Sequence, residues 1–163
     1  MIVEFGYGIL IISLALSLFA AIASLYGGIK KKTTWIESAR MAMFLIFQLT
    51  TISTLVLLYV IFRGDYSVAY VYSVSSSTMP VYLKLTALWG GQAGSLLFWA
   101  WLMAIFAFAV SLRNWKRDYE FLPWVILVPS LTLAFFLSMV VFIENPFIRF
   151  WADGMGQIYE TMF

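Results

Sequence analysis

Long hydrophobic stretches alternate with short polar segments along this sequence of 163 residues. Four of the stretches contain no Asp, Glu, Lys or Arg, and they cover residues 5–27, 41–62, 93–112 and 122–143. A helix needs about 20 mainly apolar residues to cross the ~30 Å hydrocarbon core of a bilayer. The pattern therefore predicts an all-α integral membrane protein, a single domain of about four transmembrane helices.

The basic residues predict how these helices are oriented. Seven of the ten lie in the first and third connections between the spans, and they are Lys30, Lys31, Lys32, Arg40, Arg113, Lys116 and Arg117. Short loops rich in Lys and Arg stay on the cytoplasmic side of a membrane. We therefore expect both termini, the loop 63–92 and the tail 144–163 on the exoplasmic side.

Two stripes of small or weakly polar residues indicate that the spans pack against neighbouring helices. The first predicted span carries small residues at helical spacing, namely Ser13, Ser17, Ala20 or Ala21, and Ser24. The second carries Gln48, Thr51 and Thr54, where an interhelical hydrogen bond is expected. Small residues let membrane helices approach closely, and polar side chains bond across the contact.

The composition excludes several kinds of chemistry within this chain. It has no Cys and no His, which rules out a thiol nucleophile, a disulfide, a zinc site with the usual ligands and a His-ligated heme. The net charge of +2 gives no indication of a nucleic-acid partner. We identify no catalytic residue and no metal site, and we do not expect the chain to be catalytic alone.

The connection between the second and third spans is too long to be a simple turn. Residues 65–74 are rich in Tyr and Val, which predicts an extended or strand-like segment. Pro80 then predicts the start of a short helix over residues 81–89. We expect this helix to lie in the membrane interface, with Lys84 reaching the lipid headgroups.

The most distinctive motif is Trp89-Gly90-Gly91-Gln92-Ala93-Gly94-Ser95, followed directly by Leu96-Leu97-Phe98-Trp99. Its glycines permit close approach of a backbone or a ligand, and the start of the third span leaves N–H groups that suit an anion. The alternative is a tight turn that packs on another helix, with the aromatic side chains in an interfacial belt. The sequence leaves both interpretations open.

The segments Asp65-Tyr66-Ser67-Val68 and Tyr82-Leu83-Lys84, with the motif of residues 89–99, resemble the amino-terminal part of the CcmF/NrfE family. Glu144-Asn145-Pro146-Phe147 is also similar to an element of that family. These proteins are membrane subunits of the bacterial cytochrome c heme lyase. The resemblance implies a multi-pass protein of the cytoplasmic (inner) membrane that helps attach heme covalently to apocytochrome c at the exoplasmic face.

This sequence departs from the family pattern in one important respect. Family members are several hundred residues longer, and their tryptophan-rich segment and heme-ligating histidines lie beyond the matching part. This sequence therefore looks like the amino-terminal part of a lyase, either the product of a split gene or a truncated chain. For a split subunit, the resemblance implies a complex in which a second membrane chain holds heme and receives it from a heme chaperone. It implies partner or heme contact for the motif residues Trp89, Gly90, Gly91, Gln92, Gly94, Ser95 and Trp99.

Two other classes of function stay open at this level. The chain is either a membrane scaffold that assembles with other proteins or a subunit of a transporter, in both cases without heme chemistry. Ion and proton pathways usually need ionisable groups within the membrane, and the four predicted spans have none. This counts against ion transport, but it leaves a small neutral substrate or a lipid possible.

Overall fold

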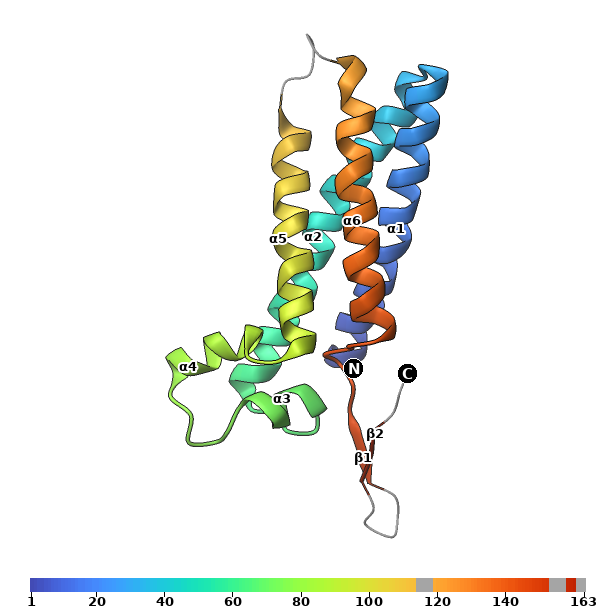
Figure 1. The fold of residues 1–163 in the computed structure, drawn as a ribbon. Helices are drawn as coiled ribbons and strands as arrows, with labels where there is room; N and C mark the ends of the chain where they lie inside the picture. The colour runs from blue at the N-terminus through green and yellow to red at the C-terminus, as the bar shows by residue number, and fades with distance from the viewer. Residues whose placement is uncertain (114–118, 153–157, 161–163) are drawn as a thin grey trace.

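The computed structural model describes residues 1–113, 119–152 and 158–160. Four long helices form an up-and-down bundle (Figure 1), and their bounds are α1 Ile2–Lys30, α2 Thr33–Arg63, α5 Gln92–Leu112 and α6 Leu122–Phe142. The shorter elements are α3 Ala69–Val74, α4 Val81–Thr86, η1 Ala87–Trp89, η2 Tyr119–Phe121, β1 Phe150–Ala152 and β2 Ile158–Glu160. All four long helices are long and apolar enough to cross a membrane, so the predicted all-α membrane bundle is confirmed.

The connection between α1 and α2 is much tighter than the hydrophobic stretches indicated. Lys31 adopts the left-handed conformation with φ 53°, and its N–H bonds the carbonyl of Gly27. Helix α2 then begins at Thr33, two turns before the apolar stretch. Hydropathy locates the part of a helix that lies in lipid, whereas the helix itself continues into the polar region.

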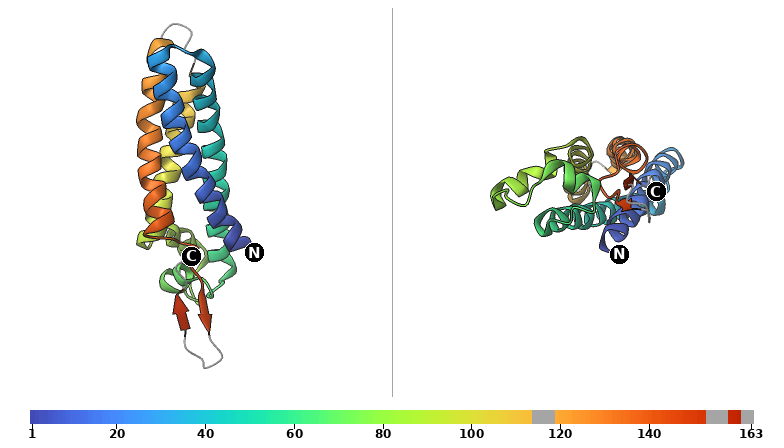
Figure 2. Two further views of the ribbon diagram at one scale, coloured as in Figure 1. Left: turned by 90° about the vertical axis from the view of Figure 1, so that its right-hand side faces the viewer. Right: turned by 90° about the horizontal axis from the view of Figure 1, so that it is seen from below.

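The small-residue stripe of α1 is a packing surface, as predicted. Its members Ser13, Ser17, Ala20, Ala21 and Ser24 are all buried. The left panel of Figure 2 shows α1 lying between α2 and α6. The serine hydroxyls donate to carbonyls of their own helix, so they occupy little space and are satisfied within the contact.

The polar stripe of α2 forms the expected interhelical bond at one of its three positions. The indole Nε1 of Trp101 on α5 donates to Thr51 Oγ1 over 2.9 Å. Thr54 is buried, and its hydroxyl bonds the Thr50 carbonyl of the same helix at 2.8 Å. Gln48, by contrast, lies on the exposed side of α2.

The prediction of an extended segment over residues 65–74 is wrong, because α3 occupies Ala69–Val74. In a strand, consecutive side chains point to opposite faces, so a single neighbouring surface would not bury both Tyr70 and Val71. In the helix they are 7% and 0% exposed, while Tyr72 is 67% exposed. Val68 keeps extended geometry, and it forms an isolated antiparallel bridge with Arg149 of the tail.

Residues 81–89 are helical, as Pro80 predicted, although the helix changes type within this segment. The six residues of α4 lead directly into the 3₁₀ turn η1. No residue of α4 is buried, whereas Leu88 of η1 is 3% exposed. The right panel of Figure 2 shows α4 projecting to one side of the bundle. Its position in a membrane interface stays a prediction.

The tail after α6 returns to the start of α1 and then forms a hairpin that the sequence analysis did not predict. The Asn145 Oδ1 accepts a hydrogen bond from the Phe147 N–H at 2.9 Å, which closes a tight turn. The buried Phe147 ring packs on Gly6, where a Cβ would lie 2.7 Å from the ring. Strands β1 and β2 then pair antiparallel, with Trp151 opposite Tyr159.

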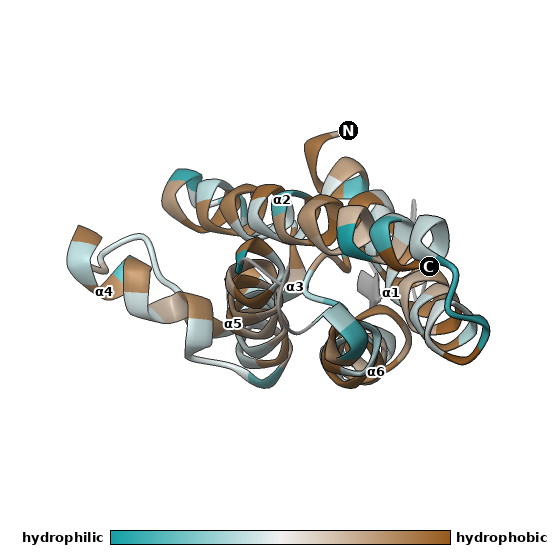
Figure 3. Cartoon of the chain, turned by 90° about the horizontal axis from the view of Figure 1, so that it is seen from above, coloured by the Kyte–Doolittle hydropathy of each residue, from teal (hydrophilic) through white to brown (hydrophobic). Residues whose placement is uncertain are grey.

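The bundle has two different polar ends, and which of them is cytoplasmic stays a prediction. The α1–α2 turn, with Lys30–Lys32, lies at one end, here called the basic end, and α3 and α4 lie at the other, the loop end (Figure 1). Figure 3 shows the hydrophilic α1–α2 turn against mainly hydrophobic helix sides. Lys116 and Arg117, which also supported the orientation, lie outside the described residues.

Candidate functional site

The glycine motif is organised by a tyrosine from the preceding helix. Tyr70 of α3 is 7% exposed, and its hydroxyl lies 2.8 Å from the Ala87 carbonyl and 3.0 Å from the Leu88 carbonyl. Burial raises the pKa of Tyr70 to about 12, although hydrogen bonds with the backbone of Gly91 and Gly94 act in the opposite direction. The tyrosine is therefore a neutral group that ties α3, η1 and the start of α5 together.

Two of the three glycines are required by this packing, and the third is not. A Cβ on Gly94 would overlap both the Tyr70 hydroxyl and the Leu88 carbonyl oxygen. A Cβ on Gly91 would lie 2.9 Å from the Tyr70 ring. At Gly90 the nearest atom would be 3.4 Å away, an ordinary contact. The close approach that the motif permits is thus made within the chain, which favours a packing turn over an open anion site.

The aromatic residues of the motif form an exposed cleft next to that turn. Its volume is about 300 Å³, and its lining residues are Trp89, Ser95, Phe98 and Trp99. Trp89 and Trp99 are 46% and 55% exposed. The Ser95 hydroxyl donates to the Trp89 carbonyl at 3.0 Å, and the rings of Trp89 and Phe98 lie 5.5 Å apart. This surface suits contact with an apolar or flat partner, and it contains no acid or base.

The structure therefore divides the residues that the sequence analysis singled out. Trp89, Ser95 and Trp99 meet in the cleft, while Gly91 and Gly94 face α3. Gly90 and Gln92 are exposed but do not line the cleft. Whether any of these residues contacts a partner or heme stays a prediction.

The sequence analysis did not single out two side chains that shape this site. Phe98 lies inside the motif and lines the cleft, and its position next to Trp99 could have indicated this. Tyr70 had no such signal, because it lies about 20 residues before the glycines and meets them only through the fold. One sequence alone does not show which distant residues a side chain contacts in the fold.

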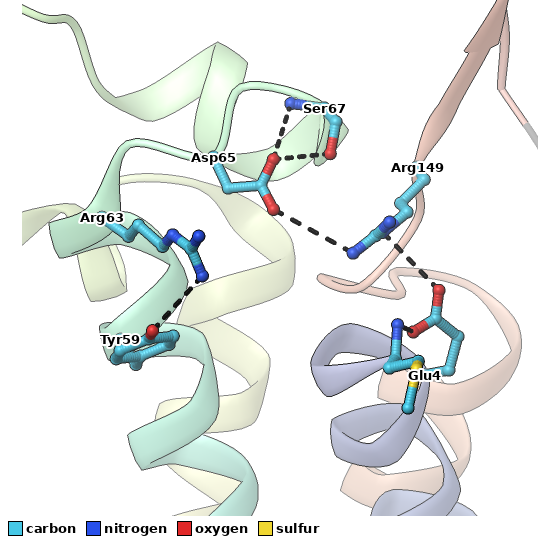
Figure 4. A network of polar contacts seen from close by, with 7 residues as sticks. Glu4, Tyr59, Arg63, Asp65, Ser67 and Arg149 are labelled. Atoms are coloured by element: carbon cyan, nitrogen blue, oxygen red, sulfur yellow. Dashed lines mark hydrogen bonds and ion pairs between the residues drawn. The ribbon is translucent and has the colours of Figure 1, made fainter.

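A second polar cluster lies at the loop end and attaches the tail to the bundle (Figure 4). The Arg149 guanidinium lies 3.7 Å from the Glu4 carboxylate and 4.0 Å from that of Asp65. Asp65 also accepts hydrogen bonds from the Ser67 N–H and hydroxyl. Arg63 contacts the Tyr59 hydroxyl at 3.4 Å. The cluster borders a cleft of about 450 Å³, and its ion pairs join α1, the start of the loop and the tail.

The residues of this chain do not fit a heme-iron site of the usual kind. There is no His and no Cys in the sequence. Within the described ranges, no group of three or more His, Cys, Asp or Glu residues could hold a metal ion. No step of heme chemistry is therefore assigned to side chains of this chain.

Comparison with known proteins found relatives over nearly the whole sequence, although no family model matches. The cytochrome c-type biogenesis protein CcmF of Haemophilus influenzae is 36% identical over 153 residues, which are 94% of this chain and 24% of that protein. CcmF of Escherichia coli is 30% identical over 91% of this chain and 23% of its own length. NrfE of Haemophilus influenzae is 31% identical over 99% of this chain and 26% of its own length. The chain thus spans about a quarter of these relatives.

A solved structure shares the fold. The cytochrome c heme lyase CcmF matches with a TM-score of 0.84 over 90% of this chain and 25% of that protein. Its sequence identity of 24% is low, so the likeness shows how the helices are arranged and not what they do.

Proposed function

This chain is related to the amino-terminal portion of the CcmF/NrfE family of cytochrome c-type biogenesis proteins, and on that premise we propose that it is a membrane subunit of a cytochrome c heme lyase. The observation that carries the proposal is similarity over more than nine-tenths of the chain to proteins named for this process. The family motif is also the part of the chain that forms an exposed aromatic cleft.

In this proposal the chain is a scaffold and does not catalyse the reaction alone. A second membrane chain supplies the tryptophan-rich segment and the histidines that hold heme. A heme chaperone delivers heme to that chain, and apocytochrome c receives it at the exoplasmic face of the inner membrane. The cleft of Trp89, Phe98 and Trp99 contacts the second chain or the heme edge, because its large exposed aromatic surface has no covering within the described residues.

The proposal requires the loop end to be exoplasmic, and the cysteine-free sequence makes this easy to test. Single cysteines replace Lys31 at the basic end and Ser76 at the loop end, both of which are exposed. A membrane-impermeant maleimide should label Ser76→Cys in intact spheroplasts and Lys31→Cys only after lysis. Labelling of Lys31→Cys in intact spheroplasts would reverse the orientation.

The function itself is tested by purifying the native complex through a tag on this chain. We expect a pyridine hemochrome spectrum and a co-purifying membrane protein that contains histidines. The same chain expressed alone should purify without a His-type low-spin spectrum, since it has no His. A native complex without heme and without any cytochrome biogenesis protein would contradict the proposal.

The contribution of the cleft is measured separately from that of the glycines. Trp99→Ala should lower covalent cytochrome heme while the chain itself keeps its normal abundance in the membrane, because this side chain is exposed. Gly91→Leu should lower heme and complex abundance together, since a side chain there meets Tyr70. If Trp99→Ala leaves cytochrome heme unchanged, the cleft has no part in the function.

A further inference from the structure

One polar side chain in the middle of a membrane helix has no partner in the structure. Gln48 lies midway between Thr33 and Arg63 of α2, and its side chain is exposed. No hydrogen bond joins its carboxamide to any described residue, although the group has two donors and an acceptor. Lipid tails offer no hydrogen bonds, so an amide facing them is costly.

The other polar residues in this part of α2 are satisfied. The hydroxyls of Thr50, Thr51 and Thr54 donate to carbonyls of their own helix. The Ser53 hydroxyl donates to the Gly6 carbonyl of α1 at 3.1 Å. The Gln48 carboxamide makes no such bond to its own helix, and its side chain lies on the exposed side of α2. It therefore has no partner among the described residues.

Gln48 lies between Phe47 and Thr51 on α2, two residues that close the seam between α2 and α5. Thr51 accepts the hydrogen bond of Trp101, and Phe47 stacks on Phe108. Only 28% of the most apolar part of α5 is buried, against 44% in α1 and in α2. Leu55, near Gln48 on α2, is 57% exposed.

Helix α4 projects from the loop end of the bundle, on the side of α5. Figure 1 shows it beyond α5, away from α1 and α6. It is largely apolar, yet Val81 and Tyr82 are each 71% exposed and no residue of α4 is buried. Helices α4 and α5 therefore both present exposed apolar residues on the side of the bundle away from α1 and α6.

We infer that a transmembrane helix of the companion membrane chain packs along the α2–α5 seam beside α4, with a hydrogen-bonding side chain opposite Gln48. This inference rests on the proposed function, which requires such a chain. Its existence is supported by the relatives, since about three-quarters of their length has no counterpart here. Lipid tails would cover this side of the bundle but would leave the carboxamide unsatisfied, whereas a helix with Asn, Gln, Ser, Thr or His at mid-depth satisfies it.

Site-specific photocross-linking in native membranes tests the placement. A benzophenone amino acid replaces Gln48, and the same probe at Leu18, which is 48% exposed in the middle of α1, reports background cross-linking. Mass spectrometry should identify an adduct at position 48 with a membrane-spanning peptide of another protein, containing a polar residue at mid-depth. Lipid adducts alone, no protein adduct, or an adduct with a second copy of this chain would overturn the inference.

Substitutions at Gln48 test the hydrogen bond. Gln48→Leu should reduce the companion chain that co-purifies by roughly three- to twentyfold, the range expected for one interhelical hydrogen bond in a membrane. Leu is favourable in a span, so the amount of inserted chain should not change. Gln48→Asn should retain more of the companion than Gln48→Leu. Equal co-purification with wild type and Gln48→Leu would contradict the inferred bond.

The outcomes separate this inference from the proposed function. If the complex contains heme but position 48 cross-links only to lipid, the proposed function is supported and the inferred contact is contradicted. If a companion helix cross-links at position 48 in a complex without heme or biogenesis proteins, the contact is supported and the proposed function is contradicted.

Discussion

Helices α1 and α5 have similar hydropathy but opposite relations to the rest of the chain. α1 lies between two helices and buries a stripe of small residues, with 44% of its most apolar part buried. α5 contacts the bundle along one side, with 28% buried, and exposes Trp99 and Phe106. The difference indicates that α1 makes more of its helix contacts within this chain than α5 does. It fits the proposal above that a further protein surface covers the α5 side.

The largest effect on stability should come from substitutions at the start of α5. Gly94→Ala places a Cβ against the Leu88 carbonyl and the Tyr70 hydroxyl, so we expect the free energy of unfolding to fall by about 3 kcal/mol. Gly90→Ala, with its nearest contact at 3.4 Å, is the matched control and should change it by less than about 0.5 kcal/mol. Thermal unfolding in detergent measures both. Equal effects would show that Tyr70 does not hold this turn.

A second pair of substitutions tests how closely the buried side of α1 is packed against its neighbouring helices. Ala20 is fully buried, whereas Ala15 lies on the exposed side of the same helix. Ala20→Leu should overpack the contact and cost about 1–3 kcal/mol, while Ala15→Leu should cost less than about 0.5 kcal/mol. Guanidinium or SDS unfolding compares the two. If Ala20→Leu is tolerated, the contacts of α1 are no more closely packed than those of α5.

A smaller effect is expected from pH, through Tyr70. Its folded-state pKa is raised to about 12 from an ordinary value of 10, so the neutral form is favoured in the folded protein. The resulting stability is present below pH 10 and is lost as the pH rises toward 12, because the unfolded state loses its proton first. Tyr70→Phe removes this titration, so the stability gap between wild type and Tyr70→Phe should narrow by about 2 kcal/mol over that range. A gap independent of pH would contradict the burial of this hydroxyl.

The sequence predicted those parts of the fold that follow from hydropathy alone. Four apolar stretches without charges indicated four helices, and the spacing of Ser13, Ser17 and Ser24 indicated the packed face of α1. The helix ends were less predictable, because Thr33 and the residues after it continue α2 beyond the apolar stretch. Helix formation and membrane burial are separate physical requirements, and only the second was visible in the pattern.

Contacts between distant residues could not be predicted from one sequence. Residues 65–74 have strand-like composition, yet α3 is a helix in which Tyr70 and Val71 are both buried against distant parts of the chain. The ion pairs of Arg149 with Glu4 and Asp65 join three separate segments, and no local sequence pattern predicts them. The aromatic cleft was partly visible because its residues are close in sequence, whereas the role of the glycines became clear only when Tyr70 was placed beside them.

The most direct test of the central claim is the amount of covalent heme on cytochrome c in membranes of cells that lack this chain. Heme staining of denaturing gels detects only heme attached through thioether bonds. We expect the deletion to abolish the cytochrome c bands, wild type to restore them, and Trp99→Ala to restore them only in part. Undiminished covalent heme in the deletion strain, with no other copy of the gene present, would contradict a role in cytochrome c maturation.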